Sequence, residues 1–127
     1  MDPIAKAKAK VAGCSHVRYS ETAGSIEVEP QDESGFAVGL RVHGGGFTVH
    51  FGWWHEEFTS ENEALNCFAF GLSEACRLKV TYHGSIPTKW VVESLRGDAW
   101  VPDSETELLL FPFWRRKRVV YRRNRAI

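Results

Sequence analysis

The stretch that decides the fold lies between residues 35 and 54 and reads GFAVGLRVHGGGFTVHFGWW. Apolar residues occupy alternate positions on both sides of the glycine run, which is typical of two half-buried β-strands joined by a tight turn. A two-residue turn at Gly44 and Gly45 places every apolar side chain on one face, whereas a three-residue turn would mix the two faces. We therefore predict a β-hairpin with these opposed pairs: Val42 and Phe47, Leu40 and Val49, and Val38 and Phe51.

The other face of this hairpin carries polar and very small side chains. In the predicted register Gly39 lies opposite His50, and Ala37 lies opposite Gly52. Glycine within a strand often marks a bulge or the close approach of another group. One interpretation is a bend or a second packing layer, and the other is a groove for a small anionic ligand. The predicted ligand-binding residues of that groove are Arg41, Thr48, His50 and Trp54, with Arg41 pairing the anion and Trp54 stacking on the ligand.

A helix is expected after the hairpin. Ser60 and Glu63 form a capping-box pattern, in which a serine begins a helix and a glutamate follows three residues later. Apolar residues then recur at helical spacing between residues 64 and 75. We expect this helix to be buried and to pack on the apolar face of the hairpin.

The remaining segments alternate in polarity as strands do. They predict short strands at residues 25–29, 77–83, 89–95 and 99–101, and a final hairpin in which 108–113 pairs with 119–123 across a connection at 114–117. Strands joined by short turns around one helix indicate an α+β domain. The predicted architecture is a mostly antiparallel, curved sheet of about seven strands with one central helix packed on one face.

A chain of 127 residues has the size of one domain. Residues 1–15 contain an alternating Ala-Lys tract and are predicted to form a loose N-terminal tail, with a frayed helix as the alternative. Residues 16–127 are then a single α+β domain. No run of about 18 apolar residues occurs, so no membrane span is expected. Three cysteines without CxxC spacing, and no apolar stretch behind the first lysines, indicate a cytoplasmic protein with free thiols.

No sequence pattern indicates catalysis, a metal ion or a cofactor. His43 and His50 share a face of the hairpin, but they lie about 14 Å apart along the strands, which is too far for one metal ion. The glycine run precedes a strand and so lacks the helix N-terminus that a phosphate-binding loop uses. GxSxG and HExxH motifs are absent. A small enzyme with His50 as general base in the groove is kept as a second alternative.

Charge is balanced overall but unevenly distributed along the chain. There are 16 basic and 16 acidic residues, yet residues 108–127 contain seven bases and no acid. Arginine pairs well with phosphate, and aromatic residues are interleaved here. Competing interpretations are a protected sheet edge, pairing with the acidic N-terminal segment within the domain or across a dimer, a solvated tail, and an anionic membrane surface. The predicted nucleic-acid-binding residues are Trp114, Arg115, Arg116, Lys117, Arg118, Arg122 and Arg123.

Together these patterns predict a small cytoplasmic binding or interaction module whose ligand the sequence does not identify. The first hypothesis is a small anionic ligand in the hairpin groove. The alternative is a nucleic-acid-binding protein that uses the C-terminal arginine-rich strip. Sixteen aromatic residues in a chain of this size also leave a homodimer open.

Overall fold

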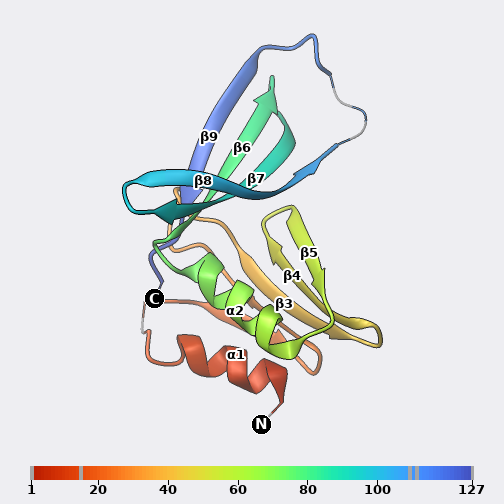
Figure 1. Ribbon diagram of the computed structural model, residues 1–127, viewed down its shortest axis with the longest axis vertical. Helices are drawn as coiled ribbons and strands as arrows, with labels where there is room; N and C mark the ends of the chain where they lie inside the picture. The colour runs from red at the N-terminus through yellow and green to blue at the C-terminus, as the bar shows by residue number, and fades with distance from the viewer. Residues whose placement is uncertain (1, 15, 109, 111, 127) are drawn as a thin grey trace.

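The computed structural model describes residues 2–14, 16–108, 110 and 112–126. Within them the chain forms two antiparallel sheets and two helices, and Figure 1 shows the sheets one above the other. The five-stranded sheet has the order β1-β2-β3-β4-β5, and the four-stranded sheet has the order β8-β7-β6-β9. The elements are α1 (Pro3–Val11), β1 (Tyr19–Thr22), β2 (Ser25–Val28), β3 (Val38–His43), β4 (Gly46–Phe51), β5 (Trp54–Phe58), α2 (Glu61–Leu72), β6 (Cys76–His83), β7 (Ile86–Arg96), β8 (Ala99–Glu107) and β9 (Lys117–Arg123).

The α+β class is confirmed, but the expectation of one sheet with about seven strands and one helix is wrong. In the part of the chain that the structure describes, nine strands divide between two sheets, and a second helix precedes them all. The predicted hairpin is confirmed as β3 and β4. Its register is the expected one, with Val42 opposite Phe47 and Leu40 opposite Val49.

The predicted helix is confirmed as α2, although it ends at Leu72, three residues earlier than the apolar pattern suggested. The Ser60 hydroxyl accepts a hydrogen bond from the backbone N–H of Glu63 at 3.3 Å, as the capping pattern predicts. The helix packs on the apolar face of β3 and β4. A Cβ on Gly71 would lie 2.3 Å from the Phe51 ring, so glycine is what allows this close approach.

The N-terminal segment is a helix where a loose tail was expected. Asp2 begins α1 by accepting a hydrogen bond from the N–H of Ala5 at 2.9 Å, and Pro3 occupies the first turn. The side chains of Ile4, Ala7 and Val11 lie on one face and are buried. Burial of this stripe against the five-stranded sheet and α2 stabilises a helix that would be marginal in isolation.

The predicted final hairpin is also wrong. β8 ends at Glu107, and β9 pairs with β6, which lies more than 30 residues earlier in the chain. Of the expected strand 108–113, Leu109 and Phe111 lie outside the described residues, and the others form no strand. Within the described residues, no helix has both the length and the apolar character needed to cross a membrane.

Two polar contacts tie the sheets together around a shared core. The indole N–H of Trp54 on β5 donates to the Ser104 hydroxyl on β8 at 3.1 Å. Asn124, just after β9, is 1% exposed and hydrogen-bonds the backbone of Phe36, just before β3. Apolar side chains of both sheets, among them Leu40 and Val49 of the first and Leu78 and Trp90 of the second, are buried in this core.

Candidate functional site

Three of the four predicted groove residues lie together on the polar face of the five-stranded sheet. Arg41 on β3 and Thr48 and His50 on β4 line a shallow hollow of about 300 Å³. Ser25 and Glu27 on β2 contribute to its wall. Both helices lie on the opposite face of this sheet (Figure 1), and no second layer of the described chain covers the hollow.

Trp54, the fourth predicted residue, lies on the other face of the sheet. β4 ends at Phe51, and a two-residue turn follows in which Gly52 has a positive φ of 59°. This turn places Trp54 opposite Phe51, so both side chains point into the core, with ring centroids 4.6 Å apart. The exposed tryptophan is Trp53, in the turn itself. The alternation expected to continue through Gly52 breaks there because the chain reverses direction.

In the predicted groove, the imidazole of His50 covers the backbone of Gly39. A Cβ on Gly39 would lie 1.9 Å from Nε2 of His50, so the imidazole rests directly on the Gly39 backbone. From there Nε2 lies 3.6 Å from a carboxylate oxygen of Glu27 on β2. Gly39 therefore allows a side chain on β4 to reach across β3 toward β2. A general-base role for His50 stays a prediction.

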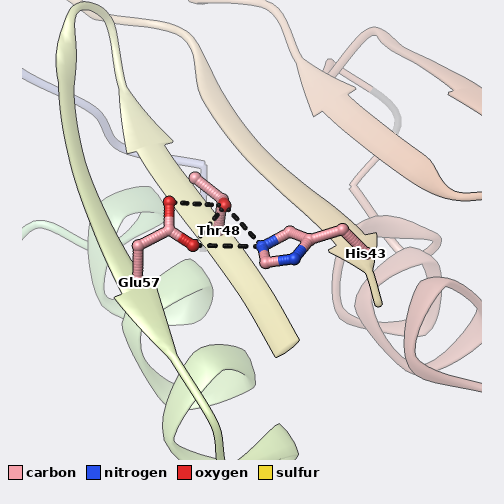
Figure 2. Close-up of polar contacts among 3 residues, drawn as sticks. All are labelled: His43, Thr48 and Glu57. Atoms are coloured by element: carbon pink, nitrogen blue, oxygen red, sulfur yellow. Dashed lines mark hydrogen bonds and ion pairs between the residues drawn. The ribbon is translucent and has the colours of Figure 1, made fainter. Parts of the chain in front are cut away.

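A second polar cluster on the same face joins three neighbouring strands (Figure 2). The Thr48 hydroxyl lies 2.8 Å from both carboxylate oxygens of Glu57, and His43 Nε2 lies 3.0 Å from Thr48 Oγ1 and 3.0 Å from Glu57 Oε2. The hydrogen bond from Thr48, and then the imidazole of His43, hold the pKa of Glu57 below its ordinary value.

This cluster lacks the geometry of a nucleophile relay. In such a relay the histidine bonds the nucleophile through one ring nitrogen and the carboxylate through the other. Here Thr48 and Glu57 meet the same nitrogen of His43, and the carboxylate accepts directly from the hydroxyl. The three groups satisfy one another and stabilise the pairing of β3, β4 and β5. Arg41 is left without an ion pair in the described part of the chain.

The C-terminal arginine-rich strip is split between the two faces of the four-stranded sheet, because side chains alternate along β9. Three of its bases bind parts of the protein itself. Arg122 donates to the backbone carbonyl of Glu33, Arg123 donates to the carbonyl of Glu74 at 2.7 Å, and Arg118 lies 4.7 Å from the centre of the Tyr82 ring. These three residues have structural contacts that the sequence did not reveal.

The rest of the strip is exposed. Arg115, Arg116 and Lys117 form no ion pair among the residues that the structure describes. Trp114 packs edge-on against Phe113, with ring centroids 5.4 Å apart, and both side chains are 74% exposed. The predicted nucleic-acid-binding residues therefore divide into an exposed half, Trp114 to Lys117, and a half engaged within the fold.

The four-stranded sheet carries a further candidate binding hollow, which the sequence did not predict. It has a volume of about 290 Å³ on the outer face of the four-stranded sheet, opposite the face that buries Leu78, Val80 and Trp90. Three lysines from three strands surround it, and we call it the lysine hollow. It is lined by Lys79, Thr81 and His83 of β6, Thr88, Lys89 and Val91 of β7, Glu107 of β8, and Lys117 and Val119 of β9.

The lysines of this hollow differ in their partners. Lys89 forms ion pairs with Glu105 at 3.0 Å and Glu107 at 3.9 Å, and the hydrogen bond with Glu105 raises its pKa. Lys79 and Lys117 face the same hollow, and neither forms an ion pair with a described carboxylate. The sequence alone shows that Lys79 alternates with apolar residues and so lies on the polar face of its strand. It does not show that β6 pairs with β9, which brings Lys117 to the same hollow.

The opposite end of this face is closed by aromatic and charged side chains. The Arg77 guanidinium donates to Glu93 at 2.5 Å and lies over the rings of Tyr121 and Trp100, at 4.2 Å and 4.6 Å from their centres. Arg123 lies 5.1 Å from the centre of the Trp100 ring. The guanidinium groups of Arg77 and Arg123 at this end are thus paired with a carboxylate or stacked on aromatic rings. The open cationic surface lies at the lysine hollow.

Comparison with known proteins gives no match to a family model, to a curated protein or to a solved structure. Within the described residues, no three His, Cys, Asp or Glu side chains come close enough together to hold a metal ion. The function must therefore be inferred from the geometry and charge of the two polar faces.

Proposed function

We propose that this protein is a binding module for a phosphate-bearing polyanion, with a nucleic acid strand as the ligand class, and that the lysine hollow is its binding site. The observation that carries the proposal is that Lys79 and Lys117 face one hollow from adjacent strands and form no ion pair with any carboxylate of the described residues. The proposal keeps the binding-module function expected from the sequence and moves its site.

Unpaired ammonium groups at the rim of a hollow favour an anionic ligand. Like charges that share a concave surface repel each other, and an anion between them relieves that repulsion. Phosphate suits this arrangement because lysine binds it as a point charge from several directions. The Thr81 hydroxyl adds a hydrogen-bonding group, and Val91 and Val119 add an apolar floor on which a sugar or base can lie.

Positive charge continues from the hollow along the chain. The Arg116 carbonyl accepts a hydrogen bond from the Gly84 N–H at 2.7 Å, which fixes this residue beside the end of β6. Arg115 and Arg116 are exposed there, next to Lys117. A strand of nucleic acid that placed one phosphate in the hollow could place its neighbours along this rim, as in electrostatic grooves that track a phosphate backbone.

The hollow on the five-stranded sheet is the second candidate, for a small anionic ligand. Arg41 supports it, because this guanidinium has no ion pair within the described residues. Most other polar groups there already have partners, since Thr48 bonds Glu57 and His50 faces Glu27. This surface offers one unpaired cation, whereas the lysine hollow offers two.

The proposal is tested by fluorescence anisotropy with single- and double-stranded oligonucleotides at several salt concentrations. We expect affinity to fall steeply with salt. Lys79→Gln and Lys117→Gln should each lower the slope of log K against log salt by roughly 0.7–0.9 units, one phosphate contact each. Lys10→Gln is the matched control, because Lys10 is exposed on α1 and forms no ion pair in the described chain. Absence of binding at low salt, or a slope unchanged in both variants, would contradict the proposal.

A further inference from the structure

The connection between β8 and β9 has an unusual sequence. Residues 108–114 are LLLFPFW, seven apolar residues in succession, and residues 115–118 are RRKR. Both ends of this connection are tied to the four-stranded sheet, since the Leu108 N–H donates to the Thr88 carbonyl at 2.8 Å and the Gly84 N–H donates to the Arg116 carbonyl at 2.7 Å. Neither the fold nor the proposed polyanion site explains the exposure of the apolar side chains that the structure describes in this connection.

The described apolar side chains of this connection are strongly exposed. Leu110 is 91% exposed, Phe113 and Trp114 are each 74% exposed, and Leu108 is 40% exposed. Apolar area exposed to water is unfavourable, and its burial against a partner stabilises the complex. Contiguous apolar patches on a protein surface commonly mark an interaction site. A partner that removes these side chains from water is therefore expected.

The composition of the patch indicates which partner. Bases of nucleic acids stack on aromatic rings, which would engage Phe113 and Trp114 but leave Leu108 and Leu110 in water. A lipid interface accommodates both aliphatic and aromatic side chains, and tryptophan is enriched at that depth. Seven apolar residues are far fewer than the roughly 20 that span a bilayer as a helix. The segment has the length for shallow insertion.

The charge next to the patch selects the kind of lipid. Four consecutive bases follow Trp114, and no acidic residue occurs from Leu108 to the C-terminus. Arg115 and Arg116 are exposed and form no ion pair within the described chain. Basic residues beside an inserted apolar segment bind anionic headgroups and are attracted to a negatively charged membrane surface.

We propose that the β8–β9 connection docks this protein on an anionic lipid surface. Leu110, Phe113 and Trp114 enter the boundary between headgroups and acyl chains, and Arg115 and Arg116 bind the headgroup phosphates. The inference goes beyond the proposed function, since it concerns the connection rather than the lysine hollow and a bilayer rather than a soluble polyanion.

Vesicle co-sedimentation tests this inference directly. The full chain is mixed with large unilamellar vesicles of phosphatidylcholine alone, or with vesicles that also contain phosphatidylglycerol, an anionic lipid that gives the bilayer a negative surface potential. We expect the protein to bind the anionic vesicles and to bind the neutral vesicles at least tenfold more weakly. Added salt should weaken the binding to anionic vesicles. The double variant Phe113→Ser/Trp114→Ser should lose at least tenfold in vesicle affinity.

Trp53 supplies a matched control. It is also 74% exposed, but it lies in the β4–β5 turn, where the sequence GWWHEE has no run of lysine and arginine residues beside it. Trp53→Ser should leave vesicle binding within about twofold, because no cationic segment places it at a negative surface. Circular dichroism confirms that each variant is folded.

Two outcomes would overturn the inference: no sedimentation with anionic vesicles, and equal losses in the Trp53 variant and the Phe113/Trp114 double variant. If the native chain does not bind vesicles and the double variant also loses oligonucleotide affinity, the connection is a base-stacking surface instead. Oligonucleotide binding is measured on the same samples, so failure of lipid docking is distinguished from failure of the polyanion site.

Discussion

The side chain of Asn124 forms two hydrogen bonds with the backbone of Phe36, 88 residues earlier in the chain. Its Oδ1 accepts from the Phe36 N–H at 3.1 Å, and its Nδ2 donates to the Phe36 carbonyl at 3.0 Å. A third bond runs from Nδ2 to the Gly71 carbonyl at 3.0 Å. One buried amide thus joins the end of β9 to the start of β3 and to the last turn of α2. It holds the four-stranded sheet against the rest of the molecule.

Replacement of this residue should be strongly destabilising. Asn124→Ala removes three hydrogen bonds and leaves buried backbone groups of Phe36 and Gly71 without partners, which costs about 2–4 kcal/mol in the free energy of unfolding. Urea denaturation measures the change. Asn66→Ala, at an exposed position of α2, is the control and should stay within about 0.5 kcal/mol. Equal stabilities for the two variants would mean that Asn124 does not join the sheets.

The contact between Gly39 and His50 predicts a coupled pair of substitutions. In the native chain Gly39→Ala forces the imidazole off the strand, since the new Cβ would meet Nε2, and we expect a loss of about 1 kcal/mol. In a His50→Ala background the same change should be neutral or stabilising, because alanine is preferred to glycine within a strand. A double-mutant cycle in urea measures the coupling. Additive effects would show that the ring does not rest on Gly39.

The lowered pKa of Glu57 predicts a dependence of stability on pH. A carboxyl group whose pKa is lower in the folded state stabilises the protein above its unfolded pKa, and that contribution disappears as pH falls through the folded value. The native chain should therefore be more stable than Glu57→Gln at pH 7, and the difference should shrink on acidification below pH 4.5, the ordinary glutamate value. Urea midpoints at three pH values measure it. A difference that is constant across this range would contradict the cause given for the shift.

Two of the three thiols should be unreactive in the folded protein. Burial raises the pKa of the Cys67 thiol to about 12 and also raises that of Cys76. At pH 8 only about one Cys67 side chain in ten thousand is then a thiolate, the form that attacks a disulfide reagent. Reaction with Ellman's reagent should release at most one equivalent quickly, from Cys14, and three equivalents in guanidinium. Cys14→Ser should abolish the fast phase, and rapid release of two or more equivalents from the folded chain would refute the assignment.

Local patterns predicted the parts of the fold that depend on neighbours in sequence. The β3–β4 register follows from alternation around Gly44 and Gly45, and the start of α2 follows from Ser60 and Glu63. Both are decided within about ten residues, by turn geometry and by capping. The same reasoning explains how Arg41, Thr48 and His50 were correctly placed on one face.

The errors concern contacts between distant segments. β9 pairs with β6 rather than with the chain just before it, and alternation in β9 alone does not specify its partner. The helix α1 depends on burial of Ile4, Ala7 and Val11 against elements that fold around it. The lysine hollow was not predictable for this reason, since only the β6–β9 pairing brings Lys117 to the sheet face that carries Lys79.

Trp54 illustrates how one turn can invert a site prediction. Alternation through Gly52 would place this side chain in the groove, but the two-residue turn at Gly52 and Trp53 moves it to the core beside Phe51. A glycine followed by a strand was compatible with both outcomes. Burial of an aromatic ring in the core stabilises the fold more than its exposure in a groove does. This difference favours the arrangement in which Trp54 packs beside Phe51.

The most direct test of polyanion binding at the lysine hollow uses a variant with reversed charge there. Its affinity for a single-stranded oligonucleotide is measured at low salt. We compare Lys79→Glu/Lys117→Glu with Lys10→Glu/Arg18→Glu, which changes the net charge equally at exposed positions of another part of the surface. We expect the oligonucleotide affinity of the first variant to fall by roughly 30-fold or more and that of the second by less than about threefold. Equal losses in both, or none in the first, would contradict the assignment of polyanion binding to Lys79 and Lys117.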